Sequence, residues 1–354
     1  MSEQTAIAVG LIGCGQYGRQ VHLPILLTMP QFRVVAMCNR SPDHLKEAAT
    51  AAHQAGFEPK TGSDWKRVVE DPDVHAVIAM LPPSFNLPII RRCAELKKPV
   101  FVEKPVAVSE QDLAELADLA QHAPMHIQVG TQLLHGAWFT ELETVIRRKG
   151  DLLALNAQVY LNDGWAFSPM TWKVDAEHCG GILNSWGVHP LTMLLRLSSL
   201  PTEGADAGNG VDYAELVAFT GSAFEREGVD PAMYDTASIA WMTVSGEAAV
   251  PCQLQIALHP DVEAPRWRIE AICSDGRVEG ELFSRVIQAT RRGGAARTKT
   301  LDAPPGPGFD GNRQQLEHFA RCIREKHADL SSLHLNLLAS RMALEVNVNP
   351  TQDE

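Results

Sequence analysis

Runs of mostly apolar residues alternate with segments of helical periodicity along the first 130 residues of this 354-residue chain. The apolar runs lie at 6–12, 32–38, 74–81, 99–102 and 125–130, and the helical segments lie at 19–29, 43–55, 64–69, 87–96 and 109–120. A short, continuous apolar run is typical of a strand buried on both faces of a parallel sheet. The alternation therefore predicts an α/β fold in which residues 1–128 form a doubly wound parallel sheet.

The pattern changes after residue 128. Helical periodicity at 140–148 and 181–197 flanks an alternating stretch at 152–161. Strand-like segments then follow one another across short turns, at 237–244, 250–258, 267–273, 277–282 and 286–290. Successive strands favour an antiparallel meander. Helical segments at 312–326 and 334–346 follow a Pro/Gly-rich loop at 303–311, so we expect residues 129–354 to form an α+β domain with an open, mostly antiparallel sheet covered on one face by helices.

Composition narrows the class of protein. The formal net charge is −12, whereas a nucleic-acid-binding domain would be basic, so we expect no nucleic-acid partner. No apolar stretch reaches the roughly 18 residues of a membrane span, and from the polar start we expect no secretory leader. The 7 cysteines and 13 histidines lack paired ligand spacing, so we expect free thiols, a cytoplasmic location, no membrane association and no metal site.

The first apolar run ends in the pattern Gly13-x-Gly15-x-x-Gly18, with Gln16 and Tyr17 between the last two glycines. Such glycines allow a sharp turn, close approach of a pyrophosphate, and tight packing of helix on strand. The helix start presents free N–H groups to the phosphates. This pattern predicts a dinucleotide site; the alternative is a tight strand-to-helix turn with nothing bound. Pro24 predicts a kink or an early end of the helix.

Asn39, Arg40 and Ser41 follow the second apolar run, about 20 residues after the last glycine. An acidic residue at this position binds the ribose hydroxyls of NAD, whereas a nearby arginine accommodates the 2′-phosphate of NADP. The acid is absent here, so the sequence favours NADP(H), with NAD(H) as the alternative. The alternative is a solvated loop in which Ser41 caps the next helix.

Two further motifs carry candidate chemistry. Glu103-Lys104-Pro105 ends a predicted parallel strand, where open α/β sheets place their ligands, and Lys104 is a candidate acid–base group. The alternative is a surface lysine paired with Glu103. Ser185 and His189 follow Gly180-Gly181 and are four residues apart, so on a helix they share a face. His189 is a natural proton acceptor near neutral pH, or alternatively a core histidine bonded to a carbonyl.

Together these motifs closely resemble the Gfo/Idh/MocA oxidoreductase family. Supporting fragments are His22-Leu23-Pro24 and the turn at Pro82-Pro83. The resemblance implies a Rossmann domain over 1–128 and a substrate-binding and oligomerisation domain over 129–354, in a homodimer or homotetramer. It also implies that NAD(P) is used to oxidise or reduce sugars, inositols and related polyols. The matching positions give Lys104 and His189 as catalytic residues.

The chain departs from the family pattern at several positions. Ser185 stands where the family usually has an acid four residues before the histidine, and Thr192 stands where another acid is usual. Asn86 replaces a usual histidine after the third strand. Candidate substrate contacts flank the motifs: Gln132, Trp172, Lys173, Ser185 and His189. Trp172 is equally compatible with packing.

The resemblance thus implies hydride transfer between NADP(H), or NAD(H), and a hydroxyl or carbonyl carbon of a small polar substrate: a sugar, modified sugar or polyol. Because Ser185 supplies no negative charge, the alternative is a non-catalytic NAD(P)(H)-binding protein with a redox-sensing or regulatory role. The expected cofactor-binding residues are Gly13, Gly15, Gln16, Tyr17, Gly18, Asn39, Arg40, Ser41, Leu81, Pro82, Pro83, Asn86, Glu103 and Lys104.

Overall fold

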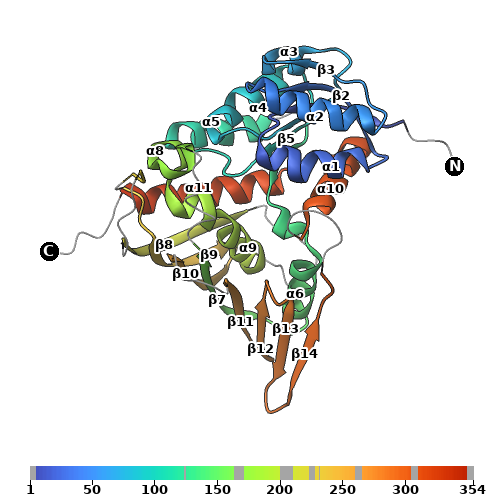
Figure 1. The fold of residues 1–354 in the computed structure, drawn as a ribbon. Helices are drawn as coiled ribbons and strands as arrows, with labels where there is room; N and C mark the ends of the chain where they lie inside the picture. The colour runs from blue at the N-terminus through green and yellow to red at the C-terminus, as the bar shows by residue number, and fades with distance from the viewer. Residues whose placement is uncertain are drawn as a thin grey trace. The chain divides into compact units, whose positions relative to one another are not determined.

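The computed structural model describes residues 5–122, 125–162, 171–199, 210–222, 228–230, 232–259, 265–303 and 310–348. The chain forms two compact units (Figure 1): unit 1 comprises residues 1–107, 114–135 and 304–333, and unit 2 comprises 108–113, 136–303 and 334–354. Unit 1 thus takes in most of the expected N-terminal domain together with a later segment. Most of the Pro/Gly-rich loop at 303–311 lies outside the described residues. Among the described helices, none is long and apolar enough to cross a membrane.

Unit 1 is built on a parallel sheet of six strands. They are β1 (Ile7–Ile12), β2 (Phe32–Cys38), β3 (Lys60–Gly62), β4 (Ala76–Ala79), β5 (Val100–Glu103) and β6 (Ile127–Gly130). Their order in the sheet is β3-β2-β1-β4-β5-β6, and every neighbouring pair is parallel. This is the Rossmann strand order, which confirms the predicted doubly wound sheet.

The helices of unit 1 connect these strands. They are η1 (Gly18–His22), α1 (Leu23–Leu27), α2 (Pro42–Gln54), α3 (Trp65–Glu70), η2 (Pro83–Phe85), α4 (Asn86–Glu95), residues 114–122 of α5 (Glu110–His122), η3 (Gln132–His135) and α10 (Asn312–Glu325). The Ser41 side chain caps α2, as the sequence suggests, and the Asp64 side chain caps α3. Pro24 lies in the first turn of α1, directly after the five-residue π-turn η1, and α1 ends at Leu27. A proline in the first turn costs no helix hydrogen bond.

Helix α10 completes the core of unit 1 although it lies nearly 200 residues beyond β6. Phe319 is fully buried and its ring lies 6.1 Å from that of Phe101 on β5 and 6.4 Å from that of Phe32 on β2. Leu316 and Ala320 belong to the same apolar cluster as β1 and α1. Figure 1 shows α10 beside α1, and Arg313 donates a hydrogen bond to Thr28 just after α1. Burial of this apolar face explains why the segment belongs to unit 1.

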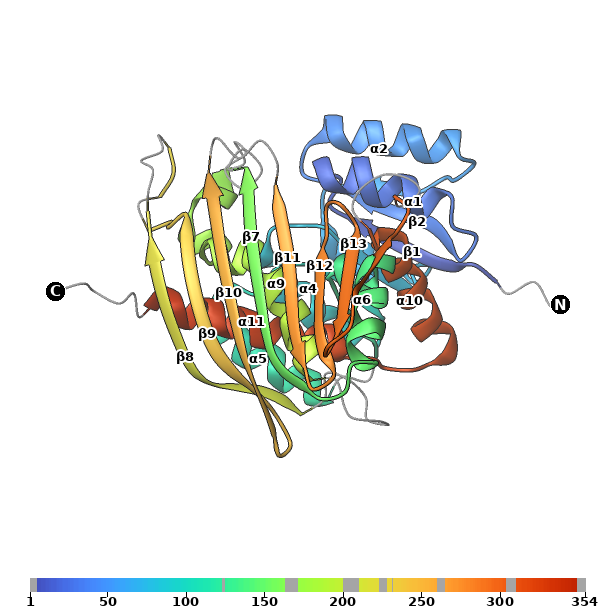
Figure 2. The same ribbon diagram turned by 90° about the horizontal axis from the view of Figure 1, so that it is seen from below.

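Unit 2 is built on an eight-stranded sheet. Its strands are β7 (Leu152–Asn162), β8 (Val211–Gly221), β9 (Thr236–Ser245), β10 (Ala248–His259), β11 (Arg266–Cys273), β12 (Gly276–Glu281), β13 (Val286–Arg291) and β14 (Ala296–Thr300). The order is β14-β13-β12-β11-β7-β10-β9-β8, and Figure 2 shows most of these strands side by side. All neighbours are antiparallel except β7 and β10, which are parallel. The expected simple meander is therefore wrong at one point, because β7 inserts between the successive strands β10 and β11.

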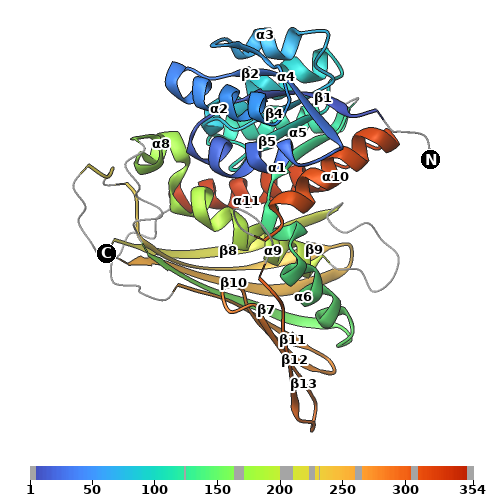
Figure 3. The same ribbon diagram turned by 45° about the vertical axis from the view of Figure 1, so that its right-hand side comes forward.

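One face of this sheet is buried and the other is open. Along β10, Leu254 and Ile256 are buried while Gln253 and Gln255 are exposed, as alternation in a half-buried strand requires. Helices α6 (Ala137–Arg147) and α9 (Val188–Ser198) contact the sheet and lie on the same side of it in Figure 3. The other described helices of the unit are η4 (Thr171–Val174), α8 (Ala176–Cys179), η5 (Leu183–Gly187) and residues 334–348 of α11 (Ser331–Val348). The α+β architecture expected from the sequence is confirmed.

Candidate nucleotide-binding and catalytic site

The glycine turn after β1 is shaped by contacts that exclude side chains. Gly13 has φ +93°, and a Cβ there would lie 2.3 Å from the backbone oxygen of Met80. A Cβ at Gly18 would lie 2.5 Å from the backbone oxygen of Gly13. Each of these two glycines is therefore required by the fold of the turn itself.

Gly15 differs from its neighbours because a Cβ at this position would meet nothing within 4 Å. The fold therefore leaves open space directly above the backbone of Gly15, at the turn between a buried strand and a helix. A dinucleotide pyrophosphate approaches the backbone at this position of the Rossmann turn. The geometry fits such a cofactor, and Gln16, which is exposed, stands at the same edge. Tyr17 is turned away to α10, where its hydroxyl donates to Asn312 Oδ1 at 2.8 Å.

The segment after β2 is anchored to the glycine turn. The side-chain oxygen of Asn39 accepts a hydrogen bond from the N–H of Cys14 at 3.0 Å, and its Nδ2 donates to the Ser41 carbonyl. Ser41 Oγ accepts from the N–H of His44, so this serine caps α2. Arg40 is exposed and makes no ion pair with any residue that the structure describes. An unpaired guanidinium at this strand end can accept a phosphate bidentately.

The turn after β4 packs on the glycine turn. A Cβ at Gly13 would lie 2.9 Å from Leu81 Cδ2, so Leu81 covers this glycine. Pro82 precedes η2, and Pro83 is its buried first residue. Leu81 and Pro82 are half-buried, so both present surface beside the glycine turn.

Asn86 has a structural role that the sequence did not predict. It is fully buried, and its Nδ2 donates to the carbonyls of Glu103 and Pro105 at 2.9 Å and of Val106 at 3.3 Å. These are backbone atoms of the turn that carries Lys104. Asn86 therefore fixes the backbone of the turn that carries Lys104.

Glu103 and Lys104 stand at the carboxyl end of β5. One carboxylate oxygen of Glu103 lies 2.8 Å from His22 Nε2, and the other accepts from the backbone N–H of Lys104 at 3.3 Å. A Cβ at Gly130 would lie 2.8 Å from the same carboxylate, so this glycine makes room for it. Glu103 is thus committed to the fully buried His22. The Lys104 side chain is half-buried, and its backbone lies in a turn that contacts α4 through Asn86 and η1 through the pairing of Glu103 with His22.

In unit 2 the paired glycines form another close approach. Gly180 and Gly181 have φ of +72° and +76°. A Cβ at Gly180 would lie 2.3 Å from Asn184 Nδ2, and a Cβ at Gly181 would lie 2.9 Å from Asn347 Nδ2. Asn347 donates to the Gly180 carbonyl at 2.8 Å and accepts from Tyr234 Oη at 2.9 Å. These amides fix the start of the segment that carries Ser185 and His189.

Ser185 and His189 are both nearly buried, at 8% and 5% exposure. Ser185 lies in the π-turn η5 and His189 at the start of α9. Ser185 Oγ reaches back to the Ile182 carbonyl at 3.5 Å, and Thr192 Oγ1 donates to the His189 carbonyl at 2.9 Å. Both hydroxyls therefore donate hydrogen bonds to backbone carbonyls. The His189 ring lies 6.4 Å from that of Trp267.

The remaining candidate substrate residues lie in two short helices. Trp172 and Lys173 are half-buried in η4 of unit 2, with Lys173 Nζ 5.6 Å from the centre of the Trp172 ring. Burial lowers the pKa of the Lys173 ammonium. Gln132 is nearly buried in η3 of unit 1.

The structure thus gathers the nucleotide candidates of unit 1 at the carboxyl ends of β1, β2, β4 and β5, where open α/β sheets bind ligands. Lys104 belongs to this group, while His189, Ser185, Trp172 and Lys173 belong to unit 2. Sequence reasoning gave no role to His22. Its spacing of four residues from Gly18, within one helical turn of the glycine motif, could have pointed to it.

Comparison with known proteins gives the same family. Residues 7–131 match the Gfo/Idh/MocA model, described as an oxidoreductase family with an NAD-binding Rossmann fold. The chain is 27% identical over 242 residues to the uncharacterized protein YMR315W of Saccharomyces cerevisiae, covering 67% of this chain and 65% of that one. It is 29% identical over 215 residues to dTDP-3,4-didehydro-2,6-dideoxy-alpha-D-glucose 3-reductase of Streptomyces violaceoruber, covering 58% and 60%. The chain therefore spans less than two thirds of the length of these relatives.

A solved structure extends the similarity of fold to nearly the whole chain. KijD10, a 3-ketoreductase from Actinomadura kijaniata solved with NADP and TDP-benzene, matches with a TM-score of 0.71 at 20% identity, covering 95% of this chain and 96% of that one. The fold match includes the sheet of unit 2, which the family model does not cover. Residues 7–131 therefore form the NAD-binding Rossmann domain of the Gfo/Idh/MocA oxidoreductase family.

Proposed function

We propose that this chain is an NADP(H)-dependent oxidoreductase that interconverts a hydroxyl and a keto group on a sugar, modified sugar or polyol. The observation that carries the proposal is the glycine turn, which is closed to side chains at Gly13 and Gly18 but open above Gly15. The Streptomyces relative is named as a reductase of a dideoxy keto sugar linked to dTDP, and KijD10 as a 3-ketoreductase. Reduction of a keto sugar is therefore the first direction to test.

Arg40 supports NADP(H) over NAD(H). Arg40 is exposed at the end of β2. Its neighbours Asn39 and Ser41 are not acidic, so neither supplies a carboxylate to bind the ribose hydroxyls. The N-terminus of α2, capped by Ser41, adds a favourable dipole for a 2′-phosphate. NADP in the KijD10 complex is consistent with this choice.

The bound nicotinamide would supply or accept the hydride. In the proposed reaction, His189 gives the carbinol oxygen its proton during reduction and takes it back during oxidation. Lys104 hydrogen-bonds the same oxygen and stabilises its developing negative charge. General acid–base help of this kind is worth roughly 10²–10⁴-fold in rate. Trp172, Lys173, Gln132 and Ser185 are proposed to hold the substrate.

Turnover of NADPH with a panel of keto sugars, including nucleotide-linked ones, tests the assignment. We expect Lys104→Met and His189→Ala to lower kcat by roughly 10²-fold or more while the Kd for NADPH changes little. Lys46→Met and His122→Ala, at exposed positions of α2 and α5, are matched controls that keep wild-type turnover.

Wild-type turnover in both Lys104→Met and His189→Ala would overturn these roles. NADPH binding without turnover on a broad panel would instead favour a redox-sensing or regulatory protein, the alternative suggested by the neutral Ser185.

We also propose a homo-oligomer in a reducing compartment such as the cytoplasm. The open face of the unit 2 sheet presents Val217 and Phe219 of β8 at 52% and 63% exposure, and such apolar surface favours association. All 7 cysteines are free and buried. Light scattering on the purified protein would measure the oligomeric state.

A further inference from the structure

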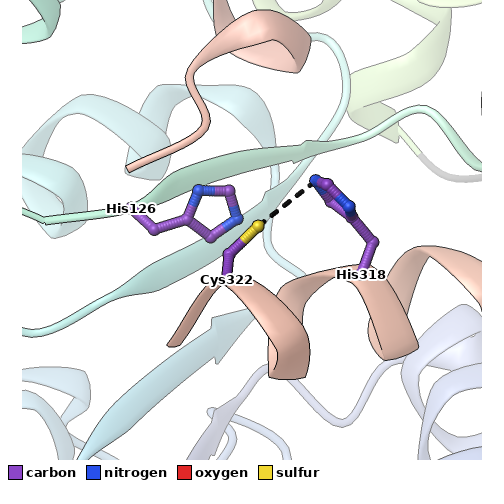
Figure 4. A group of neighbouring side chains, drawn as sticks. All are labelled: His126, His318 and Cys322. Carbon is purple, nitrogen blue, oxygen red and sulfur yellow. Dashed lines mark hydrogen bonds between the residues drawn. The ribbon is translucent and has the colours of Figure 1, made fainter. Parts of the chain in front are cut away.

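Unit 1 contains a cluster of nitrogen and sulfur side chains that the proposed reaction does not use. His126 directly precedes β6, and His318 and Cys322 are four residues apart on α10. One ligand atom from each of these residues lies within 4.8 Å of the other two. Figure 4 shows the Cys322 sulfur between the two imidazole rings, 3.5 Å from His318 Nε2. The sequence gave no hint of the cluster because nearly 200 residues separate His126 from the other two.

His126 brings a buried imidazole into this cluster. The residue is 3% exposed. One ring nitrogen lies 3.2 Å from the side-chain oxygen of Gln128, and Nδ1 has no hydrogen-bond partner among the described residues. Gln128 directs its own N–H to the Gln315 carbonyl at 2.8 Å, so its oxygen is what faces the ring. A neutral imidazole carries a lone pair on one of its two ring nitrogens, and that lone pair can bind a metal ion.

A carboxylate stands at the same place. Asp329 Oδ2 lies 3.0 Å from His318 Nε2, and the carboxyl group is about three quarters buried. The carboxylate also accepts, through Oδ1, a hydrogen bond from the Ser331 N–H at 2.8 Å. Together with a Cys322 thiolate it would carry two negative charges, which balance one divalent ion.

We propose that His126, His318 and Cys322 bind a Zn²⁺ ion, with Asp329 as the fourth ligand. Two imidazoles, one thiolate and one carboxylate are donors that zinc prefers, in tetrahedral geometry. Zinc–ligand distances of 2.0–2.3 Å place such donors roughly 3.3–3.7 Å apart. The His318–Cys322 distance of 3.5 Å already meets this value, and the His318–Asp329 distance of 3.0 Å lies close to it. The His126 donor lies within 4.8 Å of the His318 and Cys322 donors and has to move closer when the ion binds.

Binding would make two changes in the cluster. The Cys322 thiol releases its proton to solvent, since only the thiolate ligates zinc. His318 turns its Nε2 lone pair to the ion and carries its proton on Nδ1, which faces the exposed Arg321 at 2.7 Å in the structure. Arg321 gives way toward solvent.

The position of the site indicates a structural role. His126 lies at the amino end of β6, whereas the glycine turn, Arg40 and Lys104 all follow the carboxyl ends of their strands. The ion would join β6 to α10, the helix that reaches unit 1 from the far end of the chain. A closed four-coordinate zinc site stabilises the elements that it joins.

The test uses reduced, full-length protein with any purification tag removed. The chain is stripped with a chelator and titrated with Co²⁺ and then Zn²⁺. We expect one equivalent of Co²⁺ to bind with a sulfur-to-cobalt charge-transfer band and tetrahedral d–d absorption, and Zn²⁺ to displace it. At 100-fold excess over its Kd, Zn²⁺ is expected to raise Tm by roughly 5 °C or more.

Variants assign the ligands. Cys322→Ser should abolish the charge-transfer band, and His318→Gln should weaken binding by at least about 100-fold. Cys93→Ser, at another fully buried thiol of unit 1, is the matched control and keeps the band. Protection of Cys322 from alkylation by Zn²⁺ in the wild-type chain gives the answer even where a variant folds poorly. Absence of a charge-transfer band in the reduced wild type, or an unchanged band in Cys322→Ser, would overturn the proposal. None of these readouts depends on NADPH or turnover.

Discussion

The open space above Gly15 makes a sharp prediction about cofactor binding. Replacing Gly15 by alanine adds a Cβ that meets nothing within 4 Å, and Gly15 is not among the glycines with positive φ. The free energy of unfolding of unit 1 should therefore change by no more than about 0.5 kcal/mol. The added methyl would occupy the space through which a pyrophosphate approaches the backbone.

The expected loss of binding follows from the contacts that such a phosphate makes. Losing one hydrogen bond to a charged group costs about 1.5–3 kcal/mol. The Kd for NADPH should rise roughly 10- to 150-fold in Gly15→Ala. Fluorescence titration with NADPH measures the Kd, and urea unfolding measures the stability of the same preparation.

Gly13→Ala is the informative comparison. Its Cβ would collide with the Met80 backbone oxygen at 2.3 Å, at a φ that suits glycine. This variant should lose about 1–3 kcal/mol of stability, in contrast to Gly15→Ala. If Gly15→Ala binds NADPH as the wild type does, the dinucleotide does not pass over this turn and the reasoning fails.

Two further predictions concern the strand ends of unit 1. Arg40→Ala should raise the Kd for NADPH roughly 10- to 100-fold and leave the Kd for NADH within about twofold, because only NADPH carries the 2′-phosphate. Arg33→Ala, at an exposed position on β2, is the control. Equal losses of affinity for both nucleotides in Arg40→Ala would refute the NADP(H) preference. Asn86→Ala should lower the free energy of unfolding by about 2–3 kcal/mol in urea denaturation, because the carbonyls of Glu103, Pro105 and Val106 lose a buried donor. It should also lower kcat by loosening the turn that holds Lys104. The exposed Ser84→Ala should change neither quantity, and a stable, fully active Asn86→Ala would contradict the positioning role.

Much of the fold was predictable because it depends on local patterns. The buried strands β1, β2, β4, β5 and β6 carry continuous apolar runs that the sequence shows directly. The strands β3 and β14 escaped notice because every one of their residues is exposed, so no hydrophobic alternation marks them. β8 was missed as well, although it pairs with β9 along most of its length.

Non-local pairing could not be predicted in the same way. The parallel pairing of β7 with β10 and the packing of α10 on unit 1 both join segments roughly 100 to 200 residues apart. The apolar residues Leu316 and Phe319 predict that α10 buries one face, but they do not indicate which sheet this face packs against.

The candidate site shows the same division. The glycine spacing and the Ser41 cap were predictable because backbone geometry demands those residue types. The pairing of Glu103 with His22 was not, because it depends on how η1 packs beside β5. The π-turn at 183–187 also changes how Ser185 stands relative to His189, and nothing in the residue types signals it.

The transfer of deuterium from NADPH to a sugar carbon tests the central claim most directly. Protein is incubated with NADPH deuterated at C4, on either face in separate experiments, and with the keto-sugar panel; products are then read by mass spectrometry. The account predicts one deuterium on the new carbinol carbon from one face only, and loss of this label in Lys104→Met and His189→Ala. Tight NADPH binding with no labelled product from either face would contradict the assignment as a sugar oxidoreductase.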